Sequence, residues 1–277
     1  MANEYISNLF SVQDKVVVIT GGGGILCGAM ARDLAAAGAK IAVLDIMDAA
    51  AQKVAEEITA AGGIAKTFHA DVLDKTSMQA CAEQVLTHYG HVDALINGAG
   101  GNKKQATTAP DLSFFDLPQD AFQWVFNLNF LGTLLPTQVF GKILAERGEG
   151  VIINIASVNA FRPLTKIPAY SAAKAAVKNF TEWLAVHMSQ NYSTKIRVNA
   201  IAPGFSLTEQ NRFLLTDAQT GQPTARGRTI IDHTPMQRYF EPKELVGTVI
   251  WLLSPASAFV HGMTVLVDGG FCAYSGV

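Results

Sequence analysis

A tyrosine and a lysine four positions apart are the side chains of this sequence best suited to proton chemistry. Tyr170 and Lys174 lie in Tyr-Ser-Ala-Ala-Lys, and on a helix this spacing puts both on one face. A free phenol has a pKa of about 10, and a neighbouring ammonium group lowers it towards neutral pH. Ser157, upstream of Tyr170, can donate a hydrogen bond to an oxygen on which charge develops. The three side chains together predict acid/base chemistry at a carbonyl or hydroxyl group.

A run of glycines marks a second functional segment. Residues 21–24 are all glycine and stand between an apolar run and an alanine-rich stretch, as in a strand-to-helix turn that binds a pyrophosphate. Asp45 ends the next apolar run, where a carboxylate accepts hydrogen bonds from ribose hydroxyls and repels a 2′-phosphate. Ile46 and Met47 follow it, so no adjacent cation favours that phosphate. These residues predict NAD as the cofactor, with helix capping by Asp45 as the structural alternative.

Further polar residues follow the later apolar runs. Asp71 comes after the third run, and Asn97-Gly-Ala-Gly100 after the fourth. The carboxyl ends of parallel strands share one edge of a sheet, which is where open α/β sheets bind ligands. Asn129 adds a polar group to an otherwise apolar helical stretch, either for function or as a core amide.

The segment between Ser157 and Tyr170 predicts the type of substrate. It carries Asn159, Arg162 and Lys166, and the later stretch 208–212 ends in Arg212. Cations bind a carboxylate and amides bind hydroxyl groups, so this composition favours a sugar acid. Solvated loop charges are the alternative. The predicted substrate-binding residues are Asn102, Ser157, Asn159, Arg162, Lys166 and Arg212.

The order of apolar runs and helical stretches gives the frame for these residues. Short β-rich runs alternate with longer helical patterns, which predicts parallel strands joined by crossover helices. Strands are predicted at residues 15–20, 40–45, 64–70, 92–96, 151–155, 196–202 and 264–267. Helices are predicted at residues 29–37, 49–61, 75–89, 121–147, 168–190 and 242–253. The fold class is therefore α/β, a single doubly wound (Rossmann-type) parallel sheet of about seven strands with helices on both faces.

Composition narrows the class of protein. The 277 residues are 49% hydrophobic and 16% charged, which suits one domain, residues 1–277, around a buried sheet. A formal charge of −2 gives no reason to expect nucleic acid or a membrane as partner. Three widely spaced cysteines suggest neither disulfides nor a metal site, and the N-terminus has no secretion signal pattern, so we expect a cytoplasmic protein. Residues 203–240 form the longest irregular segment and are expected to be a substrate lid.

These motifs, in this order, strongly resemble the short-chain dehydrogenase/reductase family. The resemblance implies an Asn-Ser-Tyr-Lys tetrad made by Asn129, Ser157, Tyr170 and Lys174, in which Lys174 also holds the nicotinamide ribose and Asn129 positions a proton-relaying water. It implies a homotetramer with residues 121–147 and 168–190 at an interface. One departure is that Ile25 and Cys27 stand where the family's turn has its second and third glycines. Cys27 is either a redox-sensitive thiol or, as we prefer, inert packing.

The resemblance also completes the predicted cofactor site. The set is Gly21, Gly22, Gly23, Gly24, Ile25, Asp45, Asp71, Val72, Asn97, Gly98, Ala99, Gly100, Tyr170, Lys174, Pro203, Gly204 and Thr208. Longer stretches, among them residues 97–102, 159–166, 207–212 and 273–277, are similar to the D-mannonate oxidoreductases (fructuronate reductases) of the family. That likeness implies reduction of D-fructuronate to D-mannonate with NADH. A gluconate 5-dehydrogenase or other polyol dehydrogenase is the nearest alternative, and a cofactor-binding protein without turnover is a distant one.

Overall fold

Seven parallel strands form the central sheet of the computed structural model, which describes residues 2–207, 212 and 215–276. The spatial order is β3-β2-β1-β4-β5-β6-β7, and every neighbouring pair is parallel. The strands are β1 (Val16–Thr20), β2 (Lys40–Asp45), β3 (Ile64–His69), β4 (Ala94–Asn97), β5 (Gly150–Ile155), β6 (Ile196–Pro203) and β7 (Thr264–Val267). The chain order reverses between β1 and β4. This is the switch point at which doubly wound sheets bind ligands, beyond the carboxyl ends of the strands.

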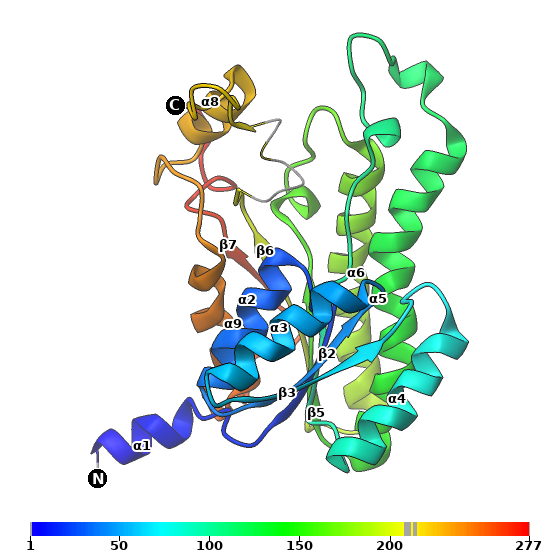
Figure 1. Ribbon diagram of the computed structural model, residues 1–277, viewed down its shortest axis with the longest axis vertical. Helices are drawn as coiled ribbons and strands as arrows, with labels where there is room; N and C mark the ends of the chain where they lie inside the picture. Colours follow the sequence, from blue (N-terminus) through cyan, green and yellow to red (C-terminus); the bar gives the residue numbers. More distant parts are fainter. Residues whose placement is uncertain (1, 208–211, 213–214, 277) are drawn as a thin grey trace.

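Helices cover both faces of the sheet (Figure 1). On one face lie α2 (Ile25–Ala36), α3 (Asp48–Ala60) and α9 (Val246–Leu253); on the other lie α4 (Lys75–Tyr89), α5 (Gln119–Arg147) and α6 (Pro168–Asn191). Alternate residues of a strand point to opposite faces, so in β1 Val17 and Ile19 pack in the first core while Val18 packs in the second. This two-sided burial explains why the first four residues of β1, Val16 to Ile19, are all apolar. The predicted fold class is confirmed.

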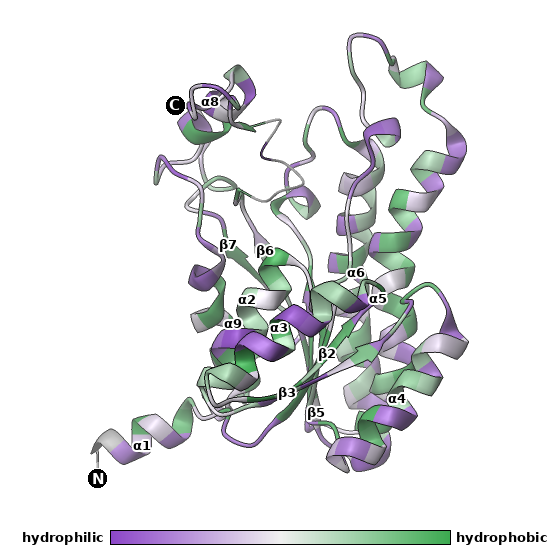
Figure 2. Cartoon of the chain, viewed as in Figure 1, coloured by the Kyte–Doolittle hydropathy of each residue, from purple (hydrophilic) through white to green (hydrophobic). Residues whose placement is uncertain are grey.

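Hydropathy follows the same layers. In Figure 2 the apolar residues gather along the central strands, whereas the outer surfaces of α3 and α4 are largely hydrophilic. In the described part of the chain, no helix is long and apolar enough to cross a membrane.

Several predicted boundaries need correction. Helix α2 begins at Ile25 rather than at residue 29, because the glycine turn leads directly into it. The predicted helix 242–253 is a short 3-10 turn, η4 (Pro242–Leu245), followed by α9. The segment 203–240 is not wholly irregular, because it contains α8 (Ala225–His233), started by the Thr224 side chain, which accepts from the backbone of Gly227. An N-terminal helix, α1 (Ala2–Leu9), was not predicted.

Candidate active site

The turn between β1 and α2 is shaped to receive a phosphate group. Gly21 has a φ of 65°, and a Cβ there would lie 2.9 Å from the Cα of Ala99. Gly24 is the N-cap of α2, and among the described residues no side chain caps the first amides of the helix. Uncapped amides at a helix N-terminus, approached over bare glycine backbone, are suited to the pyrophosphate of a dinucleotide. The glycine turn therefore fits the predicted cofactor.

Asp45 does not cap α3, whose N-cap is Met47, but it has another structural role and keeps the capacity to bind a ribose. One carboxylate oxygen accepts from the backbone N–H of Gly23 and the other from that of Met47, both at 2.9 Å. Asp45 thus fastens the glycine turn to the end of β2. A carboxylate offers about four acceptor positions, so this use leaves room for the two hydroxyls of a ribose.

Contact with Gly98 explains why a cysteine is tolerated in the turn. Cys27 is 4% exposed, and its Sγ would lie only 2.0 Å from a Cβ built on Gly98. The thiol occupies the volume that a side chain at residue 98 would need. Burial raises the pKa of the Cys27 thiol to about 12, so it stays protonated and unreactive at neutral pH. The geometry supports packing rather than redox chemistry.

The loop after β4 is held from two directions. Thr20 Oγ1 accepts from the backbone N–H groups of Gly98, at 3.1 Å, and Ala99, at 3.3 Å. The Asn97 side chain turns into the core, where its amide donates to Asn154 Oδ1 at 2.8 Å and to Thr137 Oγ1 at 2.9 Å. Asn97 can therefore contact a cofactor only through its backbone.

Ser157, Tyr170 and Lys174 meet beyond the carboxyl ends of β5 and β6. Ser157 follows β5, is 8% exposed and lies beside Tyr170, whose pKa its side chain lowers. Lys174 lies on α6, one turn after Tyr170, with its Nζ 5.6 Å from the centre of the phenol ring. That ammonium is 4% exposed and donates to the carbonyl oxygen of Ile155 at 2.7 Å. The chain thus brings the three predicted side chains together.

The acidity of the phenol differs from the expected one. Burial raises the pKa of Tyr170, and the hydrogen bond with Ser157 lowers it by less. Lys174 faces the ring and bonds Ile155, so the predicted lowering of the Tyr170 pKa by this cation is wrong for the protein's own residues. A protonated phenol is, however, the form that gives a proton to a carbonyl oxygen. Burial also lowers the pKa of Lys174 to about 8, so at neutral pH it is still mainly charged.

Asn129 clamps the loop that faces these residues. Its amide donates to the carbonyl oxygen of Gly101 at 2.7 Å, and its Oδ1 accepts from the Gly101 N–H at 3.3 Å. A Cβ on Gly100 would lie 2.6 Å from Asn129 Oδ1 and 3.5 Å from Lys174 Nζ. Asn129 and Lys174 therefore surround the same point, as a relay between them requires. The relay itself remains a prediction.

The remaining predicted cofactor residues lie at the same edge of the sheet. Asp71 caps its own turn by accepting from the N–H of Leu73 at 2.8 Å, and Val72 is buried against Gly132 of α5. Pro203 ends β6, and Gly204 follows it, its Cα hydrogens turned to the backbone of Asp268. Thr208 lies outside the described residues.

The predicted substrate residues behave differently from one another. Asn159 is 5% exposed; its N–H donates to Ser157 Oγ at 3.2 Å, and its Oδ1 has no hydrogen-bond partner among the described residues. Lys166 and Arg212 are exposed. Arg162 donates to the Cys272 carbonyl oxygen at 3.4 Å, and Asn102 donates to Thr107 at 3.0 Å. Of these predicted residues, as far as the structure describes them, only Asn159 presents a buried polar atom that lacks a partner.

Comparison with known proteins identifies the family. The family model described as short chain dehydrogenase matches residues 15–219. The chain belongs to the short-chain dehydrogenase family. It is an oxidoreductase with the Rossmann-type fold of that family, and family membership supports action on a CH–OH group.

Three relatives of this dehydrogenase are informative. The uncharacterized oxidoreductase UxuB of Bacillus subtilis is 51% identical over 272 residues, covering 95% of this chain and 96% of the relative. A Haemophilus protein solved with bound NAD, a candidate D-mannonate oxidoreductase, is 48% identical with a TM-score of 0.91, covering 98% of this chain and all of that one. A Burkholderia cenocepacia gluconate 5-dehydrogenase, solved with NADP and tartrate, is 30% identical with a TM-score of 0.86, covering 97% and 99%.

The sequence did not reveal one wall of this dehydrogenase's site. Ala106, Ala121 and Val125 form a small apolar cluster on which Tyr170 packs. The segment that carries Ala106 is also bonded to the loop between Ser157 and Tyr170, because the N–H of Thr108 donates to the Lys166 carbonyl oxygen at 2.9 Å. Nothing in the local sequence shows that residues 106–125 line the site, since this role comes entirely from contacts between segments that are far apart in the sequence.

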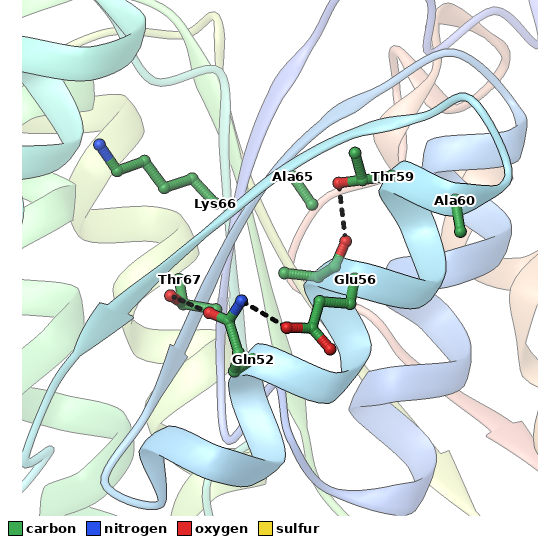
Figure 3. Close-up of a pocket in the computed structure, with 8 residues that line it drawn as sticks. Gln52, Glu56, Thr59, Ala60, Ala65, Lys66 and Thr67 are labelled. Atoms are coloured by element: carbon green, nitrogen blue, oxygen red, sulfur yellow. Dashed lines mark hydrogen bonds between the residues drawn. The ribbon is translucent and has the colours of Figure 1, made fainter.

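A hollow between α3 and β3 is unrelated to the site (Figure 3). Gln52 and Thr67 lie on its opposite sides and bond one another at 3.4 Å, and Gln52 also donates to Glu56 at 2.9 Å. The polar groups at this outer edge of the sheet thus satisfy one another. The described residues that line the hollow include none of the predicted site residues.

Proposed function

We propose that this dehydrogenase is an NAD-dependent reductase of a keto sugar acid that interconverts D-fructuronate and D-mannonate. The observation that carries the reaction type is that the Ser157 and Tyr170 side chains lie together, with the buried Lys174 side chain beside the phenol ring. In the reducing direction Tyr170 gives its proton to the substrate carbonyl oxygen, and Ser157 donates a hydrogen bond to the same oxygen. The hydride that completes the reduction would come from bound NADH.

The substrate class is supported by the chemistry that two relatives' names share. Oxidation of D-mannonate at C5 gives D-fructuronate, and a gluconate 5-dehydrogenase also acts at C5 of a six-carbon acid. D-mannonate and D-gluconate differ only in configuration at C2, next to the carboxylate. The two candidate reactions therefore present the same reacting carbon to Tyr170. The higher identity to the Haemophilus protein favours D-fructuronate over 5-keto-D-gluconate.

The polar residues around Ser157 suit a hydroxylated acid. The buried Oδ1 of Asn159 needs a donor, which a substrate hydroxyl supplies and a carboxylate does not. Asn102, Lys166 and Arg212 are proposed to receive the other hydroxyls and the carboxylate. Thr208 is proposed to contact the cofactor.

NAD is the proposed cofactor because Asp45 provides a carboxylate at the end of β2, which would accept from ribose hydroxyls and repel a 2′-phosphate. The Haemophilus protein was solved with NAD and the gluconate 5-dehydrogenase with NADP, so relatives of both kinds exist. The glycine turn and the uncapped start of α2 serve either dinucleotide. Asp45 is the residue that distinguishes them.

The experiment that tests this function is a matched substrate panel. We expect kcat/KM with NADH to be highest for D-fructuronate and about ten-fold or more lower for 5-keto-D-gluconate, which differs from it only in configuration at the carbon next to the carboxylate. The reason is that misplacing one hydroxyl at a polar site disfavours binding by about 1–3 kcal/mol. NADPH should be the poorer cofactor for both. A preference for 5-keto-D-gluconate would assign the alternative gluconate 5-dehydrogenase activity, and turnover of neither would refute the sugar-acid assignment.

We further propose one domain that assembles as a homotetramer in the cytoplasm. Trp183, Val186 and Tyr192 on or after α6 are each more than half exposed, which suits burial against another copy. Cys27, Cys81 and Cys272 are unpaired, as in a reducing compartment. Multi-angle light scattering tests the assembly: a tetramer mass is expected for the native protein, and a monomer mass would overturn it.

A further inference from the structure

Helix α8 of the lid has little apolar surface with which to hold its place. Gly227 is the only buried residue among the nine of α8, all of which the structure describes. A helix normally packs on its neighbours through an apolar stripe, and the stripe of α8 is short: Ile230 and Ile231, which follow Gly227 on the same side, are only half-buried. Figure 1 shows α8 beyond the ends of β6 and β7, beside the C-terminus of the chain. Contacts made by neighbouring segments therefore add to those that the helix makes through its own short stripe.

The C-terminal tail, residues 268–276, is a rigid segment at that position. The carboxylate of Asp268 accepts from the N–H groups of Gly270 and Cys272, both at 2.9 Å. Gly269 and Gly270 have φ angles of 61° and 88°, a conformation that favours glycine. Phe271, which this turn projects inward, is 7% exposed. The tail therefore has a defined shape although it contains no helix or strand.

The tail contacts the C-terminal end of α8. The ring of His233, the last residue of α8, lies 4.8 Å from that of Phe271 and 5.1 Å from that of Tyr274, centre to centre. The N–H of Met236 donates to the Gly269 carbonyl oxygen at 3.2 Å. These are edge or tilted aromatic contacts of the kind that add to simple burial.

The same tail is anchored to the catalytic side of the molecule. Phe271 also contacts the ring of Phe205, just after β6, at 5.1 Å. Arg162, from the loop between Ser157 and Tyr170, donates to the carbonyl oxygen of Cys272 at 3.4 Å. The tail thus touches the lid on one side and the catalytic loop on the other.

We propose that the C-terminal tail is a strap that positions α8 over the substrate, with Phe271 and Tyr274 as positioning residues. Arg162, predicted to bind a carboxylate, also contacts the strap. The family match ends at residue 219, so it does not cover this segment. The effect of the strap on turnover rests on the proposed function, whereas its effect on the lid does not.

Limited trypsin digestion of the full chain tests the strap directly. Arg226 and Arg228 lie in α8, so their cleavage reports opening of the lid. Tyr274 is 38% exposed, and its loss should leave the fold intact. We expect Tyr274→Ala to be cleaved about five-fold faster at these arginines, as loss of an aromatic pair predicts, and Tyr274→Phe to be cleaved at the wild-type rate.

Phe115→Ala is the matched control, because the 92% exposed Phe115 also contacts an aromatic ring, that of Phe114, at 5.6 Å, but belongs to the segment between β4 and α5. Its cleavage should equal that of the wild type. Cleavage at Lys53 of α3 should not change in any variant. Equal rates at the lid for Tyr274→Ala and wild type overturn the strap, as does an acceleration at Lys53 equal to that at the lid.

Kinetics then separate the strap from the proposed function. In Tyr274→Ala the KM for D-fructuronate should rise about five-fold while the Kd for NADH, from fluorescence titration without substrate, stays within about two-fold. An unchanged KM would overturn the role in substrate positioning. If the wild type turns over no keto sugar acid, the proposed function fails, and the protease result still decides whether the tail holds the lid.

Discussion

Adding one methyl group at residue 98 tests how tightly the dinucleotide turn is packed. A Cβ on Gly98 would lie 2.0 Å from Cys27 Sγ and 3.0 Å from the Thr20 carbonyl oxygen, against an ordinary contact of about 3.5 Å or more. Cys27 is 4% exposed within α2, so its thiol has no space into which to move. Gly98→Ala should therefore lower the free energy of unfolding by about 3 kcal/mol, the upper range for overpacking.

The second substitution relieves the first. Cys27→Ala alone should destabilise by about 1 kcal/mol, because it leaves a small cavity. In the double variant the nearest remaining contact besides Thr20 is Cys27 Cβ at 3.6 Å, so the methyl group added at residue 98 fills the space of the lost sulfur. The double-mutant cycle should show a coupling free energy of about 2 kcal/mol in favour of the double variant.

Urea unfolding of the four proteins, at one protein concentration, measures this coupling. The double variant should also recover NADH binding that Gly98→Ala loses, since the turn regains its shape. Additive effects, with no recovery in the double variant, would refute the claim that the thiol and residue 98 share one volume.

Two further predictions concern Lys174 and Asp45. The pKa of Lys174 is about 8 when folded and about 10.4 when unfolded, so the folded state binds fewer protons between these values and stability gains with rising pH. The unfolding free energy of wild type relative to Lys174→Met should thus rise by about 2 kcal/mol from about pH 7 to about pH 9.5, and a flat difference would contradict the burial of this charge. Asp45→Ala removes the acceptor of two backbone N–H groups of the turn, so it should raise the Kd for NADH about ten-fold or more and raise the ratio of kcat/KM with NADPH to kcat/KM with NADH. The control variant Asp48→Ala, at an exposed neighbouring carboxylate, should match wild type in both quantities. An unchanged Kd for NADH in Asp45→Ala would show that Asp45 does not belong to the cofactor site.

The order and approximate bounds of most strands and helices could be predicted from the sequence because local residue patterns determine them. Apolar β-branched runs predict strands such as β7, whose bounds matched, and α4 was also predicted residue for residue. The start of α2 was missed because glycines are poor helix formers, so the pattern became visible only at Ala29. Helix α8 was missed because its apolar stripe is short, with two adjacent isoleucines, Ile230 and Ile231, in a helix of nine residues.

The site was predictable to the extent that spacing along one element fixes it. Tyr170 and Lys174 share a face of α6 because they are one turn apart. Contacts between segments far apart in sequence were not predictable, among them Cys27 with Gly98 and His233 with Phe271. The pKa of Tyr170 was predicted in the wrong direction because burial, which outweighs its hydrogen bond, is a property of the assembled fold.

The most direct test of the account is the turnover of Tyr170→Phe. This variant keeps the ring that packs on Ala106, Ala121 and Val125 and removes only the hydroxyl beside Ser157. With D-fructuronate and NADH, kcat should fall by about 10²–10⁴-fold, while the Kd for NADH stays within about two-fold of wild type. A kcat within a few-fold of wild type would show that this phenol does not supply the proton.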